Sequence, residues 1–250
     1  MQALRKKSTS FIIVWSLLTQ SITAQFYKDM SIGLNAGAYI YQGDLTPDPL
    51  GSLKTPSMGM NLYAEKPLNS FLSARINISI AKLKGDDSKY ASPSWRKQRN
   101  FMFTTPLKEL SALLVWNILG RNYEDRGIMP YVFSGAGISF LKIKKDYSRL
   151  NGAFFGESPQ IANGLLLDNA AGTPRKLLNI PVGIGARYPL SGRISLNMEM
   201  AYRFIFTDYL DGFSQSANPK RKDHYHSTSI GLIYKFGKTN NAIGCPVMKN

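Results

Sequence analysis

The stretch ISLNMEMAYRFIFTDYLD, residues 194–211, decides the fold that we predict for this chain. From Ile194 to Phe206 every second residue is apolar, and most of the residues between them are polar or charged. Successive side chains on a β-strand point to opposite faces, so one face would be wholly apolar and the other mostly polar. A membrane-spanning strand needs about 9–11 residues, with apolar side chains facing lipid and aromatic residues near the interface. The stretch therefore predicts one strand of a transmembrane β-barrel.

Seven further segments alternate in the same way. They cover residues 31–41, 57–66, 71–82, 106–119, 128–143, 177–188 and 226–236. Short and long connections alternate between the segments, as in outer-membrane barrels, where short turns face the periplasm and long loops face outward. We therefore predict an all-β protein, an eight-stranded antiparallel up-and-down barrel of the outer-membrane type. A soluble secreted β-sandwich is the alternative.

The alternation also assigns a facing to each segment. The outward residues expected near the middle of the membrane include Ile76, Ile78, Met198 and Met200. In segment 128–143 the phase is ambiguous, because Tyr131 and Phe133 fall on the face opposite Val132 and other apolar residues. The facing of this one segment stays open on sequence grounds.

The first 24 residues are typical of a secretory signal peptide. Arg5, Lys6 and Lys7 precede a short apolar run, and Ala24 provides a cleavage site before Gln25. The apolar run is too short to cross a bilayer as a helix. We expect residues 25–237 to form the barrel and residues 238–250 a short periplasmic tail, so that both ends of the mature protein lie in the periplasm.

The chain is strongly basic, with a formal net charge of +15. Removal of the three leader charges leaves +12, and for an exported protein this excess points to anionic lipid or lipopolysaccharide rather than nucleic acid. Basic residues gather in three expected outer loops: Lys89, Arg96, Lys97 and Arg99; Lys142, Lys144, Lys145 and Arg149; Lys220, Arg221 and Lys222. These side chains would either bind lipid phosphates or form a solvated rim.

Six charged residues are expected to face the barrel interior. They are Glu65, Arg75, Glu109, Arg187, Glu199 and Arg203. The interior of an eight-stranded barrel is just wide enough for side chains to fill it, and charges confined there are costly unless they are paired. We favour a structural network of salt bridges that plugs the lumen over a path for protons or ions, and we expect no pore for large solutes.

Catalysis would need a base, and the only histidines are His224 and His226. Their spacing on a strand places both on one face, so a metal site completed by Asp208 or Asp211 is conceivable. Two histidines beside basic loop residues are more often simply solvated. We therefore predict no catalytic residues, no cofactor and no metal; an enzyme that modifies lipid A is the alternative.

Two features concern the end of the chain. The last segment carries Ser229, Gly231, Tyr234 and Phe236, in a pattern that resembles the signal read by the bacterial barrel-assembly machinery. The single cysteine, Cys245, lies in the tail that follows. In an oxidising periplasm it would be either an inert thiol or half of an intermolecular disulfide with a periplasmic partner.

Several stretches resemble a known family. They are YIYQGDL at residues 39–45, RNF at 99–101, PLKEL at 106–110, PYVFSGAG at 130–137, IPVGIG at 180–185, and Glu199 and Arg203 followed by Thr207, Asp208, Tyr209, Leu210 and Asp211. Together these are similar to the PorG family, small outer-membrane barrels associated with the type IX secretion system of Bacteroidetes. The resemblance implies a non-enzymatic barrel that anchors a periplasmic ring, built from the lipoprotein PorK and its partner PorN, beneath the outer membrane. A surface adhesin or membrane-stabilising barrel is a further alternative.

The Thr207–Asp211 stretch has a structural interpretation of its own. Aspartates accept backbone hydrogen bonds in turns, and Tyr209 can lie at an interface with its hydroxyl in water. We expect Asp208, Tyr209 and Asp211 to fix the geometry of the last long loop.

Overall fold

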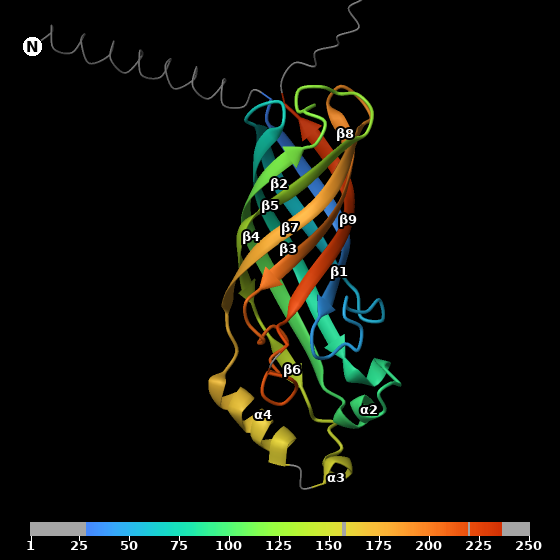
Figure 1. Ribbon diagram of the computed structural model, residues 1–250, viewed down its shortest axis with the longest axis vertical. Helices are drawn as coiled ribbons and strands as arrows, with labels where there is room; N and C mark the ends of the chain where they lie inside the picture. Colours follow the sequence, from blue (N-terminus) through green and yellow to red (C-terminus); the bar gives the residue numbers. More distant parts are fainter. Residues whose placement is uncertain (1–28, 157–158, 220, 237–250) are drawn as a thin grey trace, which may run out of the picture.

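The computed structural model describes residues 29–156, 159–219 and 221–236. Eight long antiparallel strands close into a barrel, drawn with its axis near vertical in Figure 1. They are β1 (Ser31–Gln42), β2 (Ser57–Pro67), β3 (Leu72–Asp86), β4 (Met102–Asn117), β5 (Met129–Leu141), β7 (Lys176–Pro189), β8 (Ile194–Ile205) and β9 (His224–Lys235). Their order is β3-β2-β1-β9-β8-β7-β5-β4, and pairing of β3 with β4 closes the ring, which confirms the predicted fold. A short strand, β6 (Lys144–Asp146), pairs with the outer end of β4.

The first and last strands meet along their whole length. The backbone N–H of Phe236 donates to the carbonyl of Met30 at 2.7 Å, so both ends of the described barrel lie at the end with the short turns, at the top of Figure 1. A Cβ atom at Gly231 would lie only 2.0 Å from the carbonyl oxygen of Leu34. Glycine at this position therefore lets β9 approach β1, in addition to any part it plays in an assembly signal.

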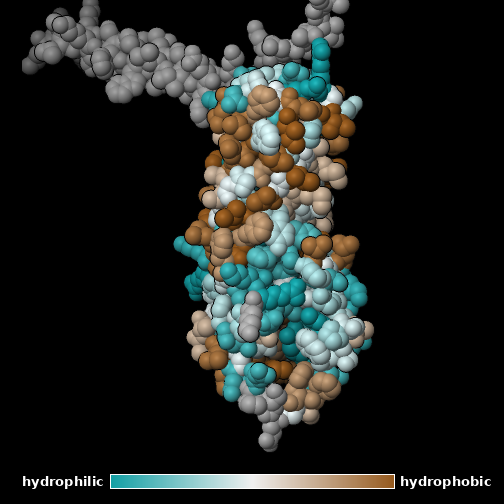
Figure 2. All heavy atoms as spheres, viewed as in Figure 1, coloured by the Kyte–Doolittle hydropathy of each residue, from teal (hydrophilic) through white to brown (hydrophobic). Residues whose placement is uncertain are grey.

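The outer wall carries an apolar band. Exposed fractions are 54% for Ile76, 47% for Ile78, 55% for Met198 and 53% for Met200, as expected for side chains that face lipid. Figure 2 shows this band as a brown zone nearer the short turns, with a teal, hydrophilic zone nearer the long loops. On β5 the ambiguous phase is resolved, because Tyr131 and Phe133 are buried in the lumen.

The strands leave the band at the end with the long loops, and here two expectations were wrong. Residues 83–104 were expected to be a loop, but β3 and β4 stay paired out to Asp86 and Met102. The strand that begins at Ile194 ends at Ile205, close to the expected start of the last long loop at Asp208, and the residues that follow contribute to the apolar cluster over the lumen. Ile40, expected to face lipid, is only 6% exposed because loop 43–56 covers it.

The long loops contain short helices, seen at the bottom of Figure 1. They are η1 (Asp87–Lys89), α2 (Trp95–Arg99), α3 (Gly152–Phe155) and α4 (Pro159–Ala171). No helix in the described part of the chain is long and apolar enough to cross a membrane.

A lysine placed in the apolar band tests its position. We expect Met198→Lys to destabilise the barrel by about 2–4 kcal/mol, because a charge would be moved to the middle of the bilayer. Urea unfolding in lipid vesicles measures the effect. Leu53→Lys, in a loop where the side chain is 80% exposed, should change stability little. Equal effects of the two substitutions would show that Met198 does not face lipid.

Candidate functional site

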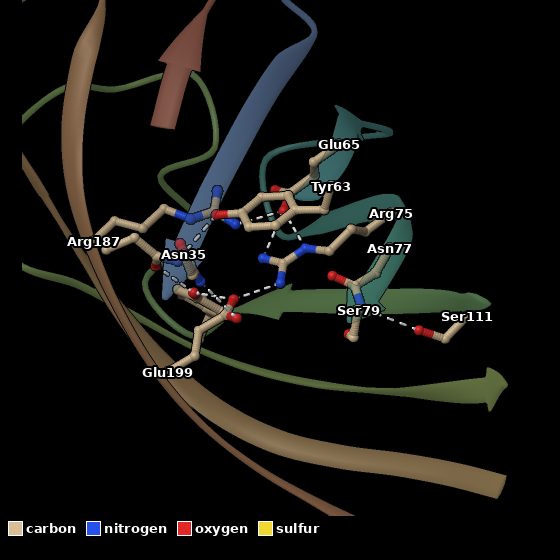
Figure 3. A network of polar contacts seen from close by, with 11 residues as sticks. Asn35, Tyr63, Glu65, Arg75, Asn77, Ser79, Ser111, Arg187 and Glu199 are labelled. Atoms are coloured by element: carbon tan, nitrogen blue, oxygen red, sulfur yellow. Dashed lines mark hydrogen bonds and ion pairs between the residues drawn. The ribbon is translucent and has the colours of Figure 1, made fainter. Parts of the chain in front are cut away.

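The centre of the lumen is organised around Arg75, which projects from β3 (Figure 3). Its guanidinium group lies 2.8 Å from Glu65 of β2 and 2.5 Å from Glu199 of β8. Arg187 of β7 reaches the same Glu65 oxygen at 2.6 Å. Four strands thus contribute to one ion-pair network across the barrel.

Aromatic and amide groups complete this layer. The Arg75 guanidinium carbon lies 4.1 Å from the centre of the Tyr63 ring, and that of Arg187 lies 4.5 Å from the centre of the Tyr131 ring. The Tyr131 hydroxyl donates to Glu199 at 2.7 Å, and the Asn35 amide donates to the other Glu199 oxygen at 3.1 Å. A planar guanidinium can bind a carboxylate and stack on a ring at the same time, which suits arginine to a buried position.

A second charged layer lies farther toward the long loops. Arg203 Nε is 3.4 Å from Glu109, and the Tyr225 hydroxyl donates to the same carboxylate at 2.6 Å. Arg203 also donates to the Ser227 hydroxyl at 2.5 Å. The structure therefore places all six charged residues expected in the lumen in two adjacent layers.

Between the layers there is a small cavity of ≈ 10 Å³, lined by residues of both layers, including Arg75 and Arg203. A cavity of this size holds about one water molecule. Side chains thus fill the lumen here, and the described residues leave no open channel through this level.

Beyond the second layer, toward the long loops, the lumen is closed by an apolar cluster. It consists chiefly of Tyr41, Leu45, Leu83, Phe101, Phe103, Leu107, Leu210 and Phe213. The rings of Phe101 and Phe213, from two different loops, stack with their centres 4.4 Å apart. The long loops are thus folded into a cap with its own core.

Buried aspartates hold the loops of this cap in place. One of them, Asp87, shows that two arginines expected at the surface are buried. Asp87 accepts hydrogen bonds from Arg96 at 2.8 Å and from Arg99 at 2.6 and 3.0 Å, and all three residues are buried. Arg96 and Arg99 were expected on a rim of lipid-binding or solvated charges, but they are buried inside the protein, where both pair with Asp87. Lys220 of that prediction lies outside the described residues.

Two more aspartates bind loop backbones. Asp168 of α4 accepts from the N–H groups of Gln215 and Ser216 at 2.9 and 3.0 Å. Asp44 accepts from the N–H of Asn218 at 2.7 Å. Sequence reasoning did not identify Asp168 and gave Asp44 only as part of the stretch 39–45, because an aspartate in a loop carries no periodic signal that reveals its partner.

The last loop contains a shared proton. The Tyr41 hydroxyl lies 2.6 Å from both Asp211 and Asp223, but a hydroxyl has only one hydrogen to donate. The second contact therefore requires a protonated carboxyl group that donates to the tyrosine oxygen. In agreement, burial raises the pKa of Asp211 to about 8 and raises that of Asp223 as well.

The Thr207–Asp211 stretch lies at the centre of the cap. Asp211 also accepts from the backbone N–H of Phe213 at 2.8 Å, and the N–H of Tyr209 donates to the Thr207 hydroxyl at 3.3 Å. Asp208 is buried, but among the described residues no backbone N–H donates to its carboxylate. The stretches 39–45, 99–101 and 207–211, which carry the family resemblance, thus meet in one core, although they are far apart in the sequence.

Comparison with known proteins places the chain in a family. The family described as a domain of unknown function, DUF6089, matches residues 6–245. The chain belongs to the DUF6089 family. No curated protein matches it.

Solved structures similar to this DUF6089 protein are outer-membrane barrels. Ail of Yersinia pestis, solved with the heparin analogue sucrose octasulfate, is 14% identical; the match covers 84% of this chain and 99% of Ail, with a TM-score of 0.45. Neisserial surface protein A is 15% identical over 83% of this chain and 97% of its own, with a TM-score of 0.45. OprG of Pseudomonas aeruginosa is 13% identical; the match covers 84% of this chain and 97% of OprG, with a TM-score of 0.46. Such likeness concerns the fold alone.

The two histidines of this DUF6089 protein lie on the outer face of β9. His224 Nδ1 accepts from the N–H of Ile205 at 3.3 Å, and His226 Nε2 lies 2.7 Å from the carbonyl oxygen of Leu50. Asp211, suggested as a third ligand, is buried inside the cap. Within residues 29–156, 159–219 and 221–236 no group of three or more histidine, cysteine, aspartate or glutamate side chains is arranged to hold a metal ion.

The residues of the predicted assembly signal lie along β9. Ser229 is buried in the lumen, and the rings of Tyr234 and Phe236 are in edge contact at the short-turn end, with centres 5.1 Å apart. The predicted leader, residues 1–24, and Cys245 lie outside the described residues, so a disulfide to a partner stays a prediction.

Removal of the central arginine should be costly for the DUF6089 barrel. Arg75→Met would leave the Glu199 carboxylate buried without its cation, and we expect a loss of about 3–5 kcal/mol in the free energy of unfolding. Urea titration in vesicles provides the measurement. Arg121→Met is the control, because Arg121 is exposed and lies 3.6 Å from Glu124 in a surface pair worth less than about 1 kcal/mol. Arg75→Met/Glu199→Gln should recover part of the loss; no recovery would contradict the network.

The cap should loosen as pH rises. Burial raises the pKa values of Asp44, Asp208 and Asp211 to about 6, 7 and 8, so the folded state binds protons more tightly than the unfolded state. The stabilisation is complete below the unfolded pKa of about 4 and is lost as pH rises through the folded values. Hydrogen exchange of residues 206–219, corrected for the intrinsic pH dependence, should therefore increase between about pH 5 and pH 8.

Asp211→Asn tests the contribution of one group to this behaviour. Asparagine cannot ionise, so the increase through about pH 8 should be reduced. Asp48→Asn, which changes an exposed carboxylate at the same end, should leave the profile as it is. A wild-type profile that does not change with pH would show that the cap is not linked to these protons.

Proposed function

We propose that this protein is a non-enzymatic, non-conducting barrel of the outer membrane that positions a periplasmic secretion ring. The observation that carries the proposal is the filled lumen, in which Arg75 bridges Glu65 and Glu199 and an apolar cap covers the far end. A barrel without an open channel has only its outer surfaces available for a partner. The resemblance to the PorG family supports the type IX secretion system as the machine, with PorK-like and PorN-like proteins as partners.

In this proposal the short turns and both ends of the mature chain face the periplasm. The turn between β4 and β5 is the most charged of the short turns, with Arg121 paired to Glu124 and Asp125 paired to Lys235 at 3.1 Å. Its side chains are 41% exposed at Arg121 and 57% at Glu124, so they are accessible to a partner. The ion pair with Lys235 fixes the turn against β9, which gives a ring protein a pre-formed surface to bind.

Co-purification from detergent-solubilised outer membranes tests the proposal. Tagged wild-type protein should retain PorK-like and PorN-like proteins. Arg121→Glu/Glu124→Lys reverses both charges of the turn and should reduce their recovery by roughly tenfold, the effect of about 1.4 kcal/mol. Lys97→Glu, at the opposite end of the barrel, is the control and should retain them. Absence of both ring proteins from the wild-type sample would overturn the proposal.

A further inference from the structure

The exposed lysines of the barrel wall near the long loops lie on one side of the molecule. They are Lys82 and Lys84 of β3, Lys108 of β4, Lys144 of β6 and Lys176 of β7, and we call them the lysine face. On the other side, β1 and β8 contain no lysine, and the lysine of β9, Lys235, lies at the short-turn end and is paired with Asp125. Near the long loops, the lysines of the strands are therefore confined to one side.

The strand register places the lysine face at the edge of the apolar band. One row across β3, β4, β5 and β7 is wholly apolar and consists of Ile78, Leu110, Ile138 and Leu178. The next row consists of Ile80, Lys108, Phe140 and Lys176. The ammonium group of Lys176 lies 5.7 Å from the centre of the Phe140 ring. Lysine stems of this kind cover apolar surface and bring the charge to the interface.

Beyond this edge the lysine face leads into a groove. The groove encloses ≈ 530 Å³, and the lysines that line it are Lys54, Lys84, Lys89, Lys144 and Lys145. In the register, Lys84, Thr104 and Lys144 form one row, four residues from Lys108, or about 13 Å along the strand. Amines at the band edge and in the groove thus follow one another outward along the same strands.

The charges in the groove are largely uncompensated. Among the described residues no ion pair reaches any of its five lysines. Lys145 contacts the carbonyl oxygen of Asp168 at 3.1 Å, and Lys54 that of Lys89 at 3.4 Å, and neither contact neutralises the ammonium charge. The groove also contains Asp86 and Asp146, which accept hydrogen bonds from Ser88 and Ser148.

The opposite side of the barrel differs at the same level. Its outward side chains on β8 and β9 include Tyr202 and His224, whose rings lie 5.5 Å apart, and loop 43–56 covers the outside of β1. Near the long loops, strand lysines next to the apolar band thus lie on the lysine face and not on β1, β8 or β9. General attraction between a basic protein and a membrane would not require this one-sided placement.

We propose that the lysine face binds an anionic glycolipid of the outer leaflet. Its acyl chains would lie along the apolar row of Ile78 and Leu110, its phosphates would meet Lys82, Lys108 and Lys176, and its sugar headgroup would enter the groove. Lysine binds phosphate as a point charge, without the fixed geometry that arginine imposes. This inference rests on the orientation given in the proposed function, but it does not depend on the secretion ring.

Lipid retention in nanodiscs tests the inference. Barrels are reconstituted in phosphatidylcholine discs that contain lipid A, re-isolated, and assayed for bound lipid A by mass spectrometry. Lys84→Gln/Lys108→Gln/Lys144→Gln should weaken binding on the order of 100-fold, because each lysine near a charged lipid surface contributes about a factor of five. Lys97→Gln/Arg149→Gln/Lys222→Gln removes the same charge from exposed positions outside the lysine face and should retain the lipid. Replacement of the three lysines of the face by arginine should also retain it.

Two further measurements separate the sources of anionic charge. Discs with phosphatidylglycerol in place of lipid A test for general attraction, and inorganic pyrophosphate tests for a site that takes free phosphate. Tighter binding of lipid A than of either, lost in the lysine-face variant alone, supports the inference. Equal binding of phosphatidylglycerol, displacement of lipid A by pyrophosphate, or equal losses in the two glutamine variants would overturn it. Recovery of the secretion ring is a separate readout, so failure of one proposal leaves the other testable.

Discussion

The pairing of Arg75 with Glu65 and Glu199 is the constraint on which the rest of the barrel depends. An eight-stranded barrel has an interior that only side chains can fill, and an unpaired charge there would be strongly unfavourable. Because the partners come from β2, β3 and β8, the network forms only when strands far apart in the sequence have closed in one register. The charged side chains of the lumen therefore have a structural role, and the layer around Arg75 provides no passage through the barrel.

The end with the long loops is closed by a different kind of packing. Aromatic and aliphatic side chains from separate loops form a core, and buried aspartates such as Asp87 and Asp168 fix the loops around it. The stretches that carry the family resemblance meet in this cap. Their common role here is to hold the cap together, so they support membership in a shared fold more directly than they support a particular partner.

With the lumen filled and the cap closed, the surfaces available for recognition are the turns and the outer wall. The two surfaces differ in chemistry. The turn around Arg121 and Glu124 carries charges of both signs, which suits a protein partner, whereas the lysine face carries mainly one sign beside an apolar band, which suits an anionic lipid. Under the two proposals, the lysine face would hold the barrel in its membrane and the turn would hold the periplasmic assembly.

The sequence by itself determined the number of barrel strands, the facing of all but β5 and the six charged lumen residues, because a period of two residues is a local property that each strand shows alone. It also predicted that Arg96 and Arg99 would be exposed, and it missed Asp87, Asp168 and the lysine face. These features depend on which loops and strands become neighbours. Asp87 meets Arg96 and Arg99 only when the tip of the β3–β4 hairpin has folded, and Asp168 and the lysines meet their neighbours only when separate loops and strands come together, so the folded structure decided these features.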